Sequence, residues 1–175
     1  THVVLTHMHG DHIGGMTTEN GDKTYANAAL ITGAVEYDAW AAQDNETFDA
    51  KVRPFADEFT FVEDGAQIAP GVTAMAAFGH TPGHMTYMLE SGGEQLLLVA
   101  DLANHYLWSL GYPDWDVRFD MDKEAAAATR RRVLGMLAAD RIPMIGYHMP
   151  FPAAGFVEPR GDGFRYVPVS YQLMG

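Results

Sequence analysis

Four short apolar segments of this sequence are each followed closely by a side chain that can bind a metal ion. The segments lie at residues 3–6, 71–78, 96–100 and 144–146. The side chains that follow them are His7, His80, Asp101 and His148. Short apolar runs bounded by turn residues predict buried β-strands. Since rigid strands that end in ligand-bearing loops gather a site from distant parts of a chain, the pattern predicts an α/β fold with one polar site at the strand ends.

The rest of the chain continues this mixed α/β pattern. Further strands are expected at 28–32, 59–62, 85–90 and 164–169. Helices are expected at 34–43 and 123–139, and Asp122 is a suitable N-cap for the second helix. Because the sequence contains no internal repeat and no low-complexity linker, residues 1–175 are expected to form a single domain.

Composition limits the partners that this chain can have. Its formal net charge is −12, and binding to phosphate needs clustered Lys and Arg. The sequence therefore argues against nucleic acid and against an anionic membrane as partners. The basic cluster at residues 130–132 is predicted to lie on a solvated helix face. There is no cysteine, so neither disulfides nor thiolate ligands can form.

Three histidines and one aspartate fall close together directly after the first apolar run. They are His7, His9, Asp11 and His12. In an extended turn, residues two apart project to the same side, which would bring His7, His9 and Asp11 together and leave His12 for a neighbouring metal. With the residues that follow the other three strands, the set holds five imidazoles and two carboxylates. Such a set suits two divalent cations, most readily Zn²⁺, and Mn, Fe or Co can occupy the same ligands.

Several ordered motifs carry a resemblance to a known family. The run His-X-His-X-Asp-His at 7–12, the run Gly-His-Thr-Pro-Gly-His at 79–84, Asp101 and His148 together resemble the motifs of the metallo-β-lactamase superfamily. Residues 146–152 and 166–171 are similar to its methyl parathion hydrolase branch. The resemblance implies an αβ/βα four-layer sandwich, here lacking its amino-terminal part.

The resemblance also implies how the ligands divide between two metals. One metal would take His7, His9 and His80, the second would take Asp11, His12 and His148, and Asp101 would bridge them. Two such cations can share a hydroxide, because coordination lowers the pKa of water towards ~7. The hydroxide would cleave an ester, lactone or phosphotriester. Asp11 would orient it and move a proton, and Asp101 would hold the metal spacing.

Four further side chains are assigned to the surroundings of this centre: His84, Asn104, His105 and Trp40. His84 either orients a ligand or loop by hydrogen bonding or is a purely structural residue. Asn104 stands where related lactonases place a tyrosine that polarises the substrate. Either Asn104 or His105 donates to a substrate oxygen, or Asn104 caps a loop. Trp40 belongs either to the core, the commoner place for such a residue, or to an aromatic wall of the substrate pocket.

Two other functions stay open at this point. A mono-iron sulfur dioxygenase of the same superfamily is similar in the first motif but uses fewer ligands, so the number of bound metals distinguishes it. Alternatively, the chain is an inert fragment, since it begins inside an expected strand without an initiator Met. An apolar sheet face would then lie open beside the ligand cluster. The resemblance also implies a homodimer, and the sequence leaves periplasmic, secreted and cytoplasmic locations open.

Replacing Asp101 with Ala in the intact protein is expected to abolish both metal binding and hydrolysis. The substitution removes the one carboxylate that is assigned to both metals. Elemental analysis and the turnover of a simple ester measure the effect. Metal content and turnover equal to those of the unchanged protein would contradict the assignment.

Overall fold

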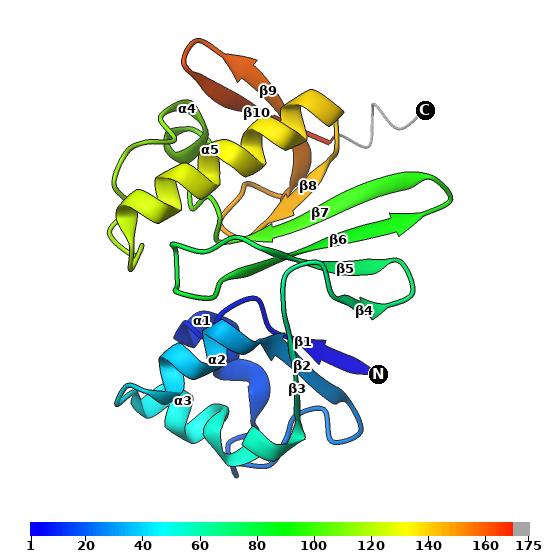
Figure 1. The fold of residues 1–175 in the computed structure, drawn as a ribbon, viewed down its shortest axis with the longest axis vertical. Coiled ribbons are helices and arrows are strands. Elements are labelled where there is room, and N and C mark those ends of the chain that lie inside the picture. The colour runs from blue at the N-terminus through cyan, green and yellow to red at the C-terminus, as the bar shows by residue number, and fades with distance from the viewer. Residues whose placement is uncertain (170–175) are drawn as a thin grey trace.

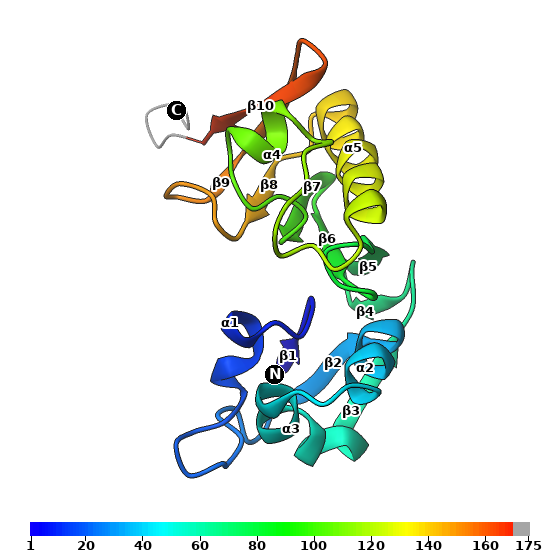
Figure 2. The same ribbon diagram turned by 90° about the vertical axis from the view of Figure 1, so that its left-hand side faces the viewer.

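The computed structural model describes residues 1–169 as four layers, with helices on both outer sides and two β-sheets between them (Figure 1). A three-stranded sheet and its helices form the lower half in Figure 1, and a seven-stranded sheet and its helices form the upper half. The same two halves are seen from another side in Figure 2. This order of layers is the αβ/βα sandwich that the sequence predicts.

The smaller sheet is entirely parallel. Its strands, in spatial order, are β1 (His2–Val4), β2 (Ala29–Gly33) and β3 (Phe59–Val62). Parallel neighbours need a crossover between them. The crossovers contain α1 (Gly10–Ile13) and the 3₁₀ turn Gly14–Met16, then α2 (Ala34–Ala41), α3 (Glu46–Lys51) and the 3₁₀ segment Arg53–Glu58. Asn45 begins α3 by accepting a hydrogen bond from the backbone N–H of Phe48 at 2.9 Å.

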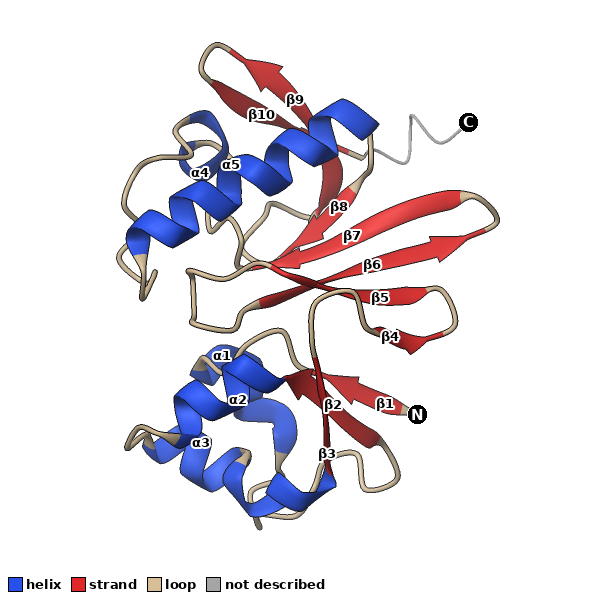
Figure 3. Cartoon of the chain, viewed as in Figure 1, coloured by secondary structure: helices blue, strands red, loops and turns tan. Residues whose placement is uncertain are grey.

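The larger sheet is mixed and runs in the order β10-β9-β8-β7-β6-β5-β4. Its strands are β4 (Gln67–Ala69), β5 (Val72–Ala76), β6 (Met85–Ser91), β7 (Glu94–Ala100), β8 (Met144–Gly146), β9 (Ala154–Arg160) and β10 (Gly163–Pro168). The connection from β7 to its parallel neighbour β8 carries α4 (Trp108–Gly111) and α5 (Lys123–Asp140), and α5 crosses the outer side of the sheet (Figure 3). Within residues 1–169, no helix has the length and apolar character needed to cross a membrane.

Alternation of side chains along the strands builds the core between each pair of layers. On β2, Leu30 packs towards the helices with Trp40 and Phe48, while the next residue, Ile31, faces the other sheet and packs with Tyr87. Successive side chains of a strand point to opposite faces, so one strand supplies two cores.

The strand β7 shows the same division. Leu97 and Val99 pack with Leu134 of α5, whereas Leu98 packs into the core between the sheets. A continuous apolar run is needed here because both faces of the strand are covered.

Two hydrogen bonds join the sheets close to the end of β1. The backbone N–H of Met85 donates to the carbonyl oxygen of Thr6 at 2.9 Å, and the hydroxyl of Tyr87 donates to the carbonyl oxygen of Leu5 at 2.9 Å. They fix the loop after β1 against the start of β6.

Most predicted elements are present, and the omissions share a cause. The strands at 59–62 and 144–146 have the predicted bounds, and α5 begins directly after its N-cap Asp122, which accepts from Ala125 at 3.0 Å. Five elements, β4, β9, α1, α3 and α4, were not predicted from the sequence, because they are short or interrupted by Gly and Pro. Ser170 and Tyr171, part of the closing motif, lie outside the described residues.

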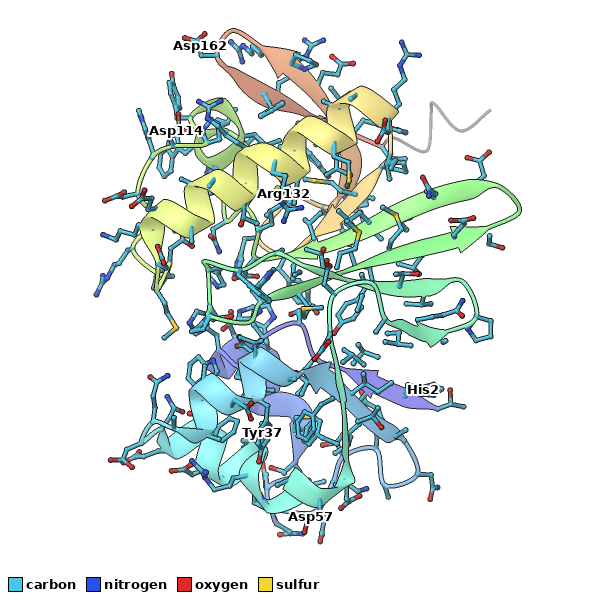
Figure 4. All side chains as sticks on the ribbon, viewed as in Figure 1. His2, Tyr37, Asp57, Asp114, Arg132 and Asp162 are labelled. Carbon is cyan, nitrogen blue, oxygen red and sulfur yellow. The ribbon has the colours of Figure 1, made fainter. Side chains whose placement is uncertain are left out.

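The prediction that residues 130–132 all lie on a solvated face is wrong at its first position. Arg130 is 1% exposed, because it lies on the side of α5 that faces the β7–α5 connection. Arg131 pairs at the surface with Asp114, and Arg132 donates to the carbonyl oxygen of Ala76 at 2.9 Å (both Asp114 and Arg132 are labelled in Figure 4).

An apolar groove of about 430 Å³ opens between β1 and the larger sheet. Its lining includes Val4, Val72, Leu98, Ile145 and Met149. His148 forms part of its rim. The expectation that an amino-terminal part is missing stays a prediction.

Gly79 allows the loop after β5 to lie against the first turn of α5. Its φ is +128°, and a Cβ atom at this position would come within 2.2 Å of the backbone nitrogen of Ala126. In return, the carbonyl oxygen of Gly79 accepts from the N–H of Asp122 at 2.9 Å. This contact sets the position of the next residue, His80.

Replacing Gly79 with Ala is expected to lower the free energy of unfolding by at least about 2 kcal/mol, since it combines an unfavourable φ with a backbone clash. Urea unfolding measures the loss. Gly21→Ala is the matched control, because Gly21 also has a positive φ, +87°, with open space around it; a loss of about 1 kcal/mol is expected there. Equal losses in the two variants would contradict the role of the contact.

Candidate metal centre

Seven side chains from four loops converge where the two sheets meet. The loops follow β1, β5, β7 and β8. Their ligand atoms form three groups, each within 4.8 Å: His7, His9 and His80; His7, His12 and Asp101; Asp11, His12 and His148. All seven residues predicted as ligands from the sequence are therefore brought together. Their role as ligands stays a prediction.

Asp11 lies on a different side of the cluster from the one that an extended turn would give it. The chain leaves the extended conformation at His9 and enters the helical turn α1 at Gly10. Asp11 consequently groups with His12 and His148 instead of with His7 and His9. This grouping differs from the one expected from extended geometry for Asp11. The division between two metals that the family resemblance implies stays a prediction.

A buried ion pair fixes the tautomer of His80. The Nδ1 atom of His80 lies 2.9 Å from Oδ1 of Asp120, and Oδ2 of Asp120 accepts from Arg130 at 2.7 Å. Asp120 and Arg130 are both almost fully buried. A carboxylate only accepts hydrogen bonds, so Nδ1 of His80 carries the proton and Nε2 keeps its lone pair. That Nε2 lies 3.0 Å from Nδ1 of His9.

The carboxylate of Asp101 lies close to several polar side chains. Its Oδ2 lies 3.1 Å from Nε2 of His148 and accepts from the side-chain amide of Asn104 at 3.0 Å. Its Oδ1 lies 3.2 Å from Nε2 of His12. Burial raises the pKa of Asp101, but the nearby imidazoles of His12, His80 and His148 lower it to about 2. The carboxyl group is therefore ionised at neutral pH.

His84 binds the backbone of Asp101 from inside the protein. Its Nε2 accepts a hydrogen bond from the backbone N–H of Asp101 at 3.2 Å, and the ring is fully buried. Burial, reinforced by the neighbouring His80, lowers the pKa of His84 to about 3. Of the two roles considered for this residue, the geometry favours orientation of the loop that carries Asp101.

Several ligand atoms of the cluster are buried without a hydrogen-bond partner. They are Nε2 of His7, Nε2 of His12 and Oδ1 of Asp101. Burial lowers the pKa of His7 and of His9, and the surrounding imidazoles lower both further, so these rings are neutral. Buried imidazole nitrogens and a carboxylate oxygen that lack hydrogen-bond partners and lie close together are the kinds of donor that divalent cations bind.

Glu36 ties the two histidine loops together, and it was not predicted from the sequence. This fully buried carboxylate accepts from the N–H of Met8 at 2.9 Å, from the hydroxyl of Thr81 at 2.7 Å and from the N–H of Gly83 at 2.9 Å. Burial raises the pKa of Glu36, while these three hydrogen bonds oppose the shift. The helix α2 also contains the acidic residue Asp38, so nothing in the sequence singled out Glu36.

Two backbone positions next to the cluster are strained. Ala100 and His148 have φ values of +47° and +61°, in the left-handed region that favours glycine. Both stand at or just after strand ends that present predicted ligands. Such conformations persist where the surroundings hold them in place, and they gather at functional sites.

The remaining predicted residues take different positions. The side-chain amide of Asn104 donates to Asp101, and Asn104 also lines the cavity above the cluster, so its role toward the substrate stays a prediction. His105 turns away, and its Nδ1 accepts from the N–H groups of Leu107 and Trp108 at 3.2 and 3.3 Å. Trp40 is 6% exposed and packs in the core, with its ring 5.6 Å from that of His9.

A cavity of about 390 Å³ opens above the cluster. It is lined by His9, Gly10, Asp11, His80, Asp101, Asn104, Phe119 and His148. The side chain of Asp11 is 63% exposed, in contrast to 5% for Asp101. The cavity therefore has one buried carboxylate at its floor and one accessible carboxylate at its mouth.

Comparison with known proteins identifies a family and several relatives of this chain. The family model described as the metallo-beta-lactamase superfamily matches residues 1–144. An N-acyl homoserine lactonase from Bacillus sp. is 30% identical over 90 residues, which are 51% of this chain and 33% of the relative. The enzyme of the same name from Bacillus cereus is 29% identical over 98 residues, 56% of this chain and 36% of the relative. The match thus spans about a third of the length of these relatives.

Solved structures share the fold closely. AidC, described as a dizinc quorum-quenching lactonase in complex with a product, N-hexanoyl-L-homoserine, superposes with a TM-score of 0.87 at 26% identity. The superposition covers 96% of this chain and 64% of AidC. A hydrolase of the beta lactamase superfamily, AbOPH, gives the same TM-score and coverage at 24% identity. The predicted fold class is confirmed.

Replacing Asp120 with Ala is expected to weaken zinc binding by roughly 10–100-fold, because His80 loses the partner that fixes its tautomer and ring orientation. Competition with a chromophoric chelator measures the affinity, and circular dichroism checks that the variant folds. Asp114→Ala is the control, since Asp114 pairs with Arg131 at the surface (Figure 4). Equal affinities in the two variants would contradict the role of Asp120.

Proposed function

Since the chain belongs to the metallo-beta-lactamase superfamily, we propose that it is a metal-dependent hydrolase of lactones and esters that binds two divalent cations, most readily zinc. The observation that carries the proposal is the arrangement of donors. One group is built on His9 and His80, the other on Asp11 and His148, and Asp101 lies between them. Two groups of donors around one carboxylate provide places for two cations.

When bound, such cations polarise a carbonyl oxygen and lower the pKa of water, which supplies a nucleophile at neutral pH. The chain itself supplies the remaining functions. Asp101, held by His84 and Asn104, keeps its position at the floor of the cavity. Asp11 is accessible at the mouth, where its carboxylate can accept a proton during attack and return it to the leaving oxygen.

The relatives favour a lactone as the substrate class. Those named above are N-acyl homoserine lactonases, and the AidC complex holds a ring-opened product. We therefore place cyclic esters with an N-acyl group first among substrates. The methyl parathion hydrolase-like assignment is kept as a further part of the proposal, and phosphotriester cleavage is its test. Its support is the run of residues 146–152, which contains His148.

The proposal is tested with the zinc-loaded chain. Elemental analysis is expected to give about two metals per chain, as the two donor groups require. Hydrolysis of N-hexanoyl-homoserine lactone, a simple aryl ester and a phosphotriester is followed by proton release. Asp11→Asn is expected to lower kcat by about 100-fold or more, since the amide cannot accept the proton. Asp57→Asn, on the far side of the smaller sheet (Figure 4), is the control and is expected to retain full activity.

The alternatives give different outcomes in the same experiment. A single bound iron, with oxygen-dependent oxidation of a persulfide, would identify a sulfur dioxygenase and overturn the proposal. Two bound metals without hydrolysis of any of the three substrates would identify an inert chain. The second donor set, Asp11, His12 and His148, favours the hydrolase, because a site for a single iron does not need a second group of ligands.

A further inference from the structure

Exposed aromatic side chains gather in the connection between β7 and α5. They include Tyr106, Trp108, Tyr112, Trp115 and Phe119, all of them more than a third exposed. Contiguous exposed apolar surface of this kind marks a place where something binds. The connection begins at Asp101, and two of its residues, Asn104 and Phe119, also line the cavity above the candidate metal centre.

Two stacked pairs give this surface flat walls. The rings of His105 and Trp108 stack with centroids 4.4 Å apart and an interplanar angle of 20°. The rings of Tyr112 and Trp115 stack with centroids 4.1 Å apart and an angle of 13°. The ring of Tyr106 also stacks on His105, with centroids 4.9 Å apart, so Trp108, Tyr112 and Trp115 are the rings that offer flat faces to an apolar group.

The connection is held in place from inside the molecule. The hydroxyl oxygen of Ser109 accepts from the backbone N–H groups of Asn104 and His105 at 3.2 and 3.1 Å. The buried guanidinium of Arg130 donates to the carbonyl oxygen of Pro113 at 2.6 Å. The aromatic walls are therefore fixed before a ligand arrives, which reduces the entropy lost on binding.

These walls enclose a cavity of about 470 Å³, which we call the aromatic cavity. It is lined by the two stacked pairs together with residues 116–119. Asn104 and Phe119 line both this cavity and the one above the metal centre, so the two adjoin. Charge is confined to Asp116 and Arg118 among its lining residues.

We propose that the aromatic cavity receives the apolar part of the substrate, an alkyl or aryl group, while the ester or lactone group lies over the metal centre. This inference rests on the proposed function. A concave apolar space that adjoins a polar site, with a few polar groups at the junction, is the usual form of a small-molecule site. Burial of each methylene group is expected to raise affinity about fourfold.

The substrate test compares three lactones on the zinc-loaded chain: γ-butyrolactone, γ-decalactone and γ-phenyl-γ-butyrolactone. The substituted lactones are expected to have kcat/KM values at least about tenfold above that of the unsubstituted one. Trp115→Ala is expected to lower this preference at least fivefold, mainly through KM, because it removes one wall. The alkyl and aryl lactones distinguish the two kinds of apolar group. Tyr25→Ala, which removes a ring 61% exposed elsewhere on the surface, is the control and is expected to keep the preference.

A second measurement does not depend on hydrolysis. The neutral amides hexanamide and phenylacetamide are titrated while tryptophan fluorescence is recorded. Trp108 and Trp115 line the aromatic cavity, whereas Trp40 is buried in the other half. A saturable change that is smaller in Trp115→Phe supports the inference even if no lactone is cleaved. No saturable change, together with an unaltered lactone preference in Trp115→Ala, would overturn it even if hydrolysis occurs.

Light scattering separates substrate binding from self-association. If Trp115→Ala converts a dimer to a monomer and leaves the lactone preference unchanged, the aromatic surface belongs to an interface between two copies and the inference is wrong. An unchanged molar mass with a reduced preference supports it.

Discussion

The site depends on one buried carboxylate. Glu36 lies on the first turn of α2 in one half of the molecule, and it accepts hydrogen bonds from the loop that follows β1 and from the loop that follows β5. A buried carboxylate is costly unless such bonds satisfy it. Because its partners come from both halves, the two histidine loops must meet at one relative position. The hydrogen bonds that the carbonyl oxygens of Thr6 and Leu5 accept from the second sheet also fix this relative position.

A second buried polar chain acts from the opposite side. It runs from Arg130 through Asp120 to His80, and each member is nearly inaccessible to solvent. Breaking a buried ion pair leaves an uncompensated charge, so these residues depend strongly on one another. The same Arg130 also supports the backbone of the β7–α5 connection through Pro113. One guanidinium group therefore links the orientation of a predicted ligand to the shape of the neighbouring surface.

The sequence was informative where chemistry and periodicity coincide. The seven residues that the structure brings together were predicted as ligands because His and Asp side chains that recur directly after apolar strands are typical of a metal site. The strands themselves were predicted from their apolar runs. The sequence did not predict the buried polar residues Glu36, Asp120 and Arg130, because their role depends on partners that are distant in the chain. Glu36 binds Met8 and Thr81, which lie at least 28 residues away. Asp120, the partner of Arg130, binds His80 across 40 residues. Extended geometry gave the wrong neighbours for Asp11, because no capping residue or apolar pattern near Gly10 indicated the helical turn that begins there.

The strands carry the predicted ligands, while the β7–α5 connection carries the exposed rings and touches the cavity above the metal centre through Asn104 and Phe119. The predicted ligands and the exposed rings are thus different residues, although the connection also contains Asp101 and Asp120. Substitutions at exposed rings such as Trp108 or Trp115 can change the width or polarity of this surface while the predicted metal ligands stay the same. A protein of this kind can acquire a preference for new substrates through single substitutions of the exposed rings, because these substitutions leave the predicted metal ligands unchanged.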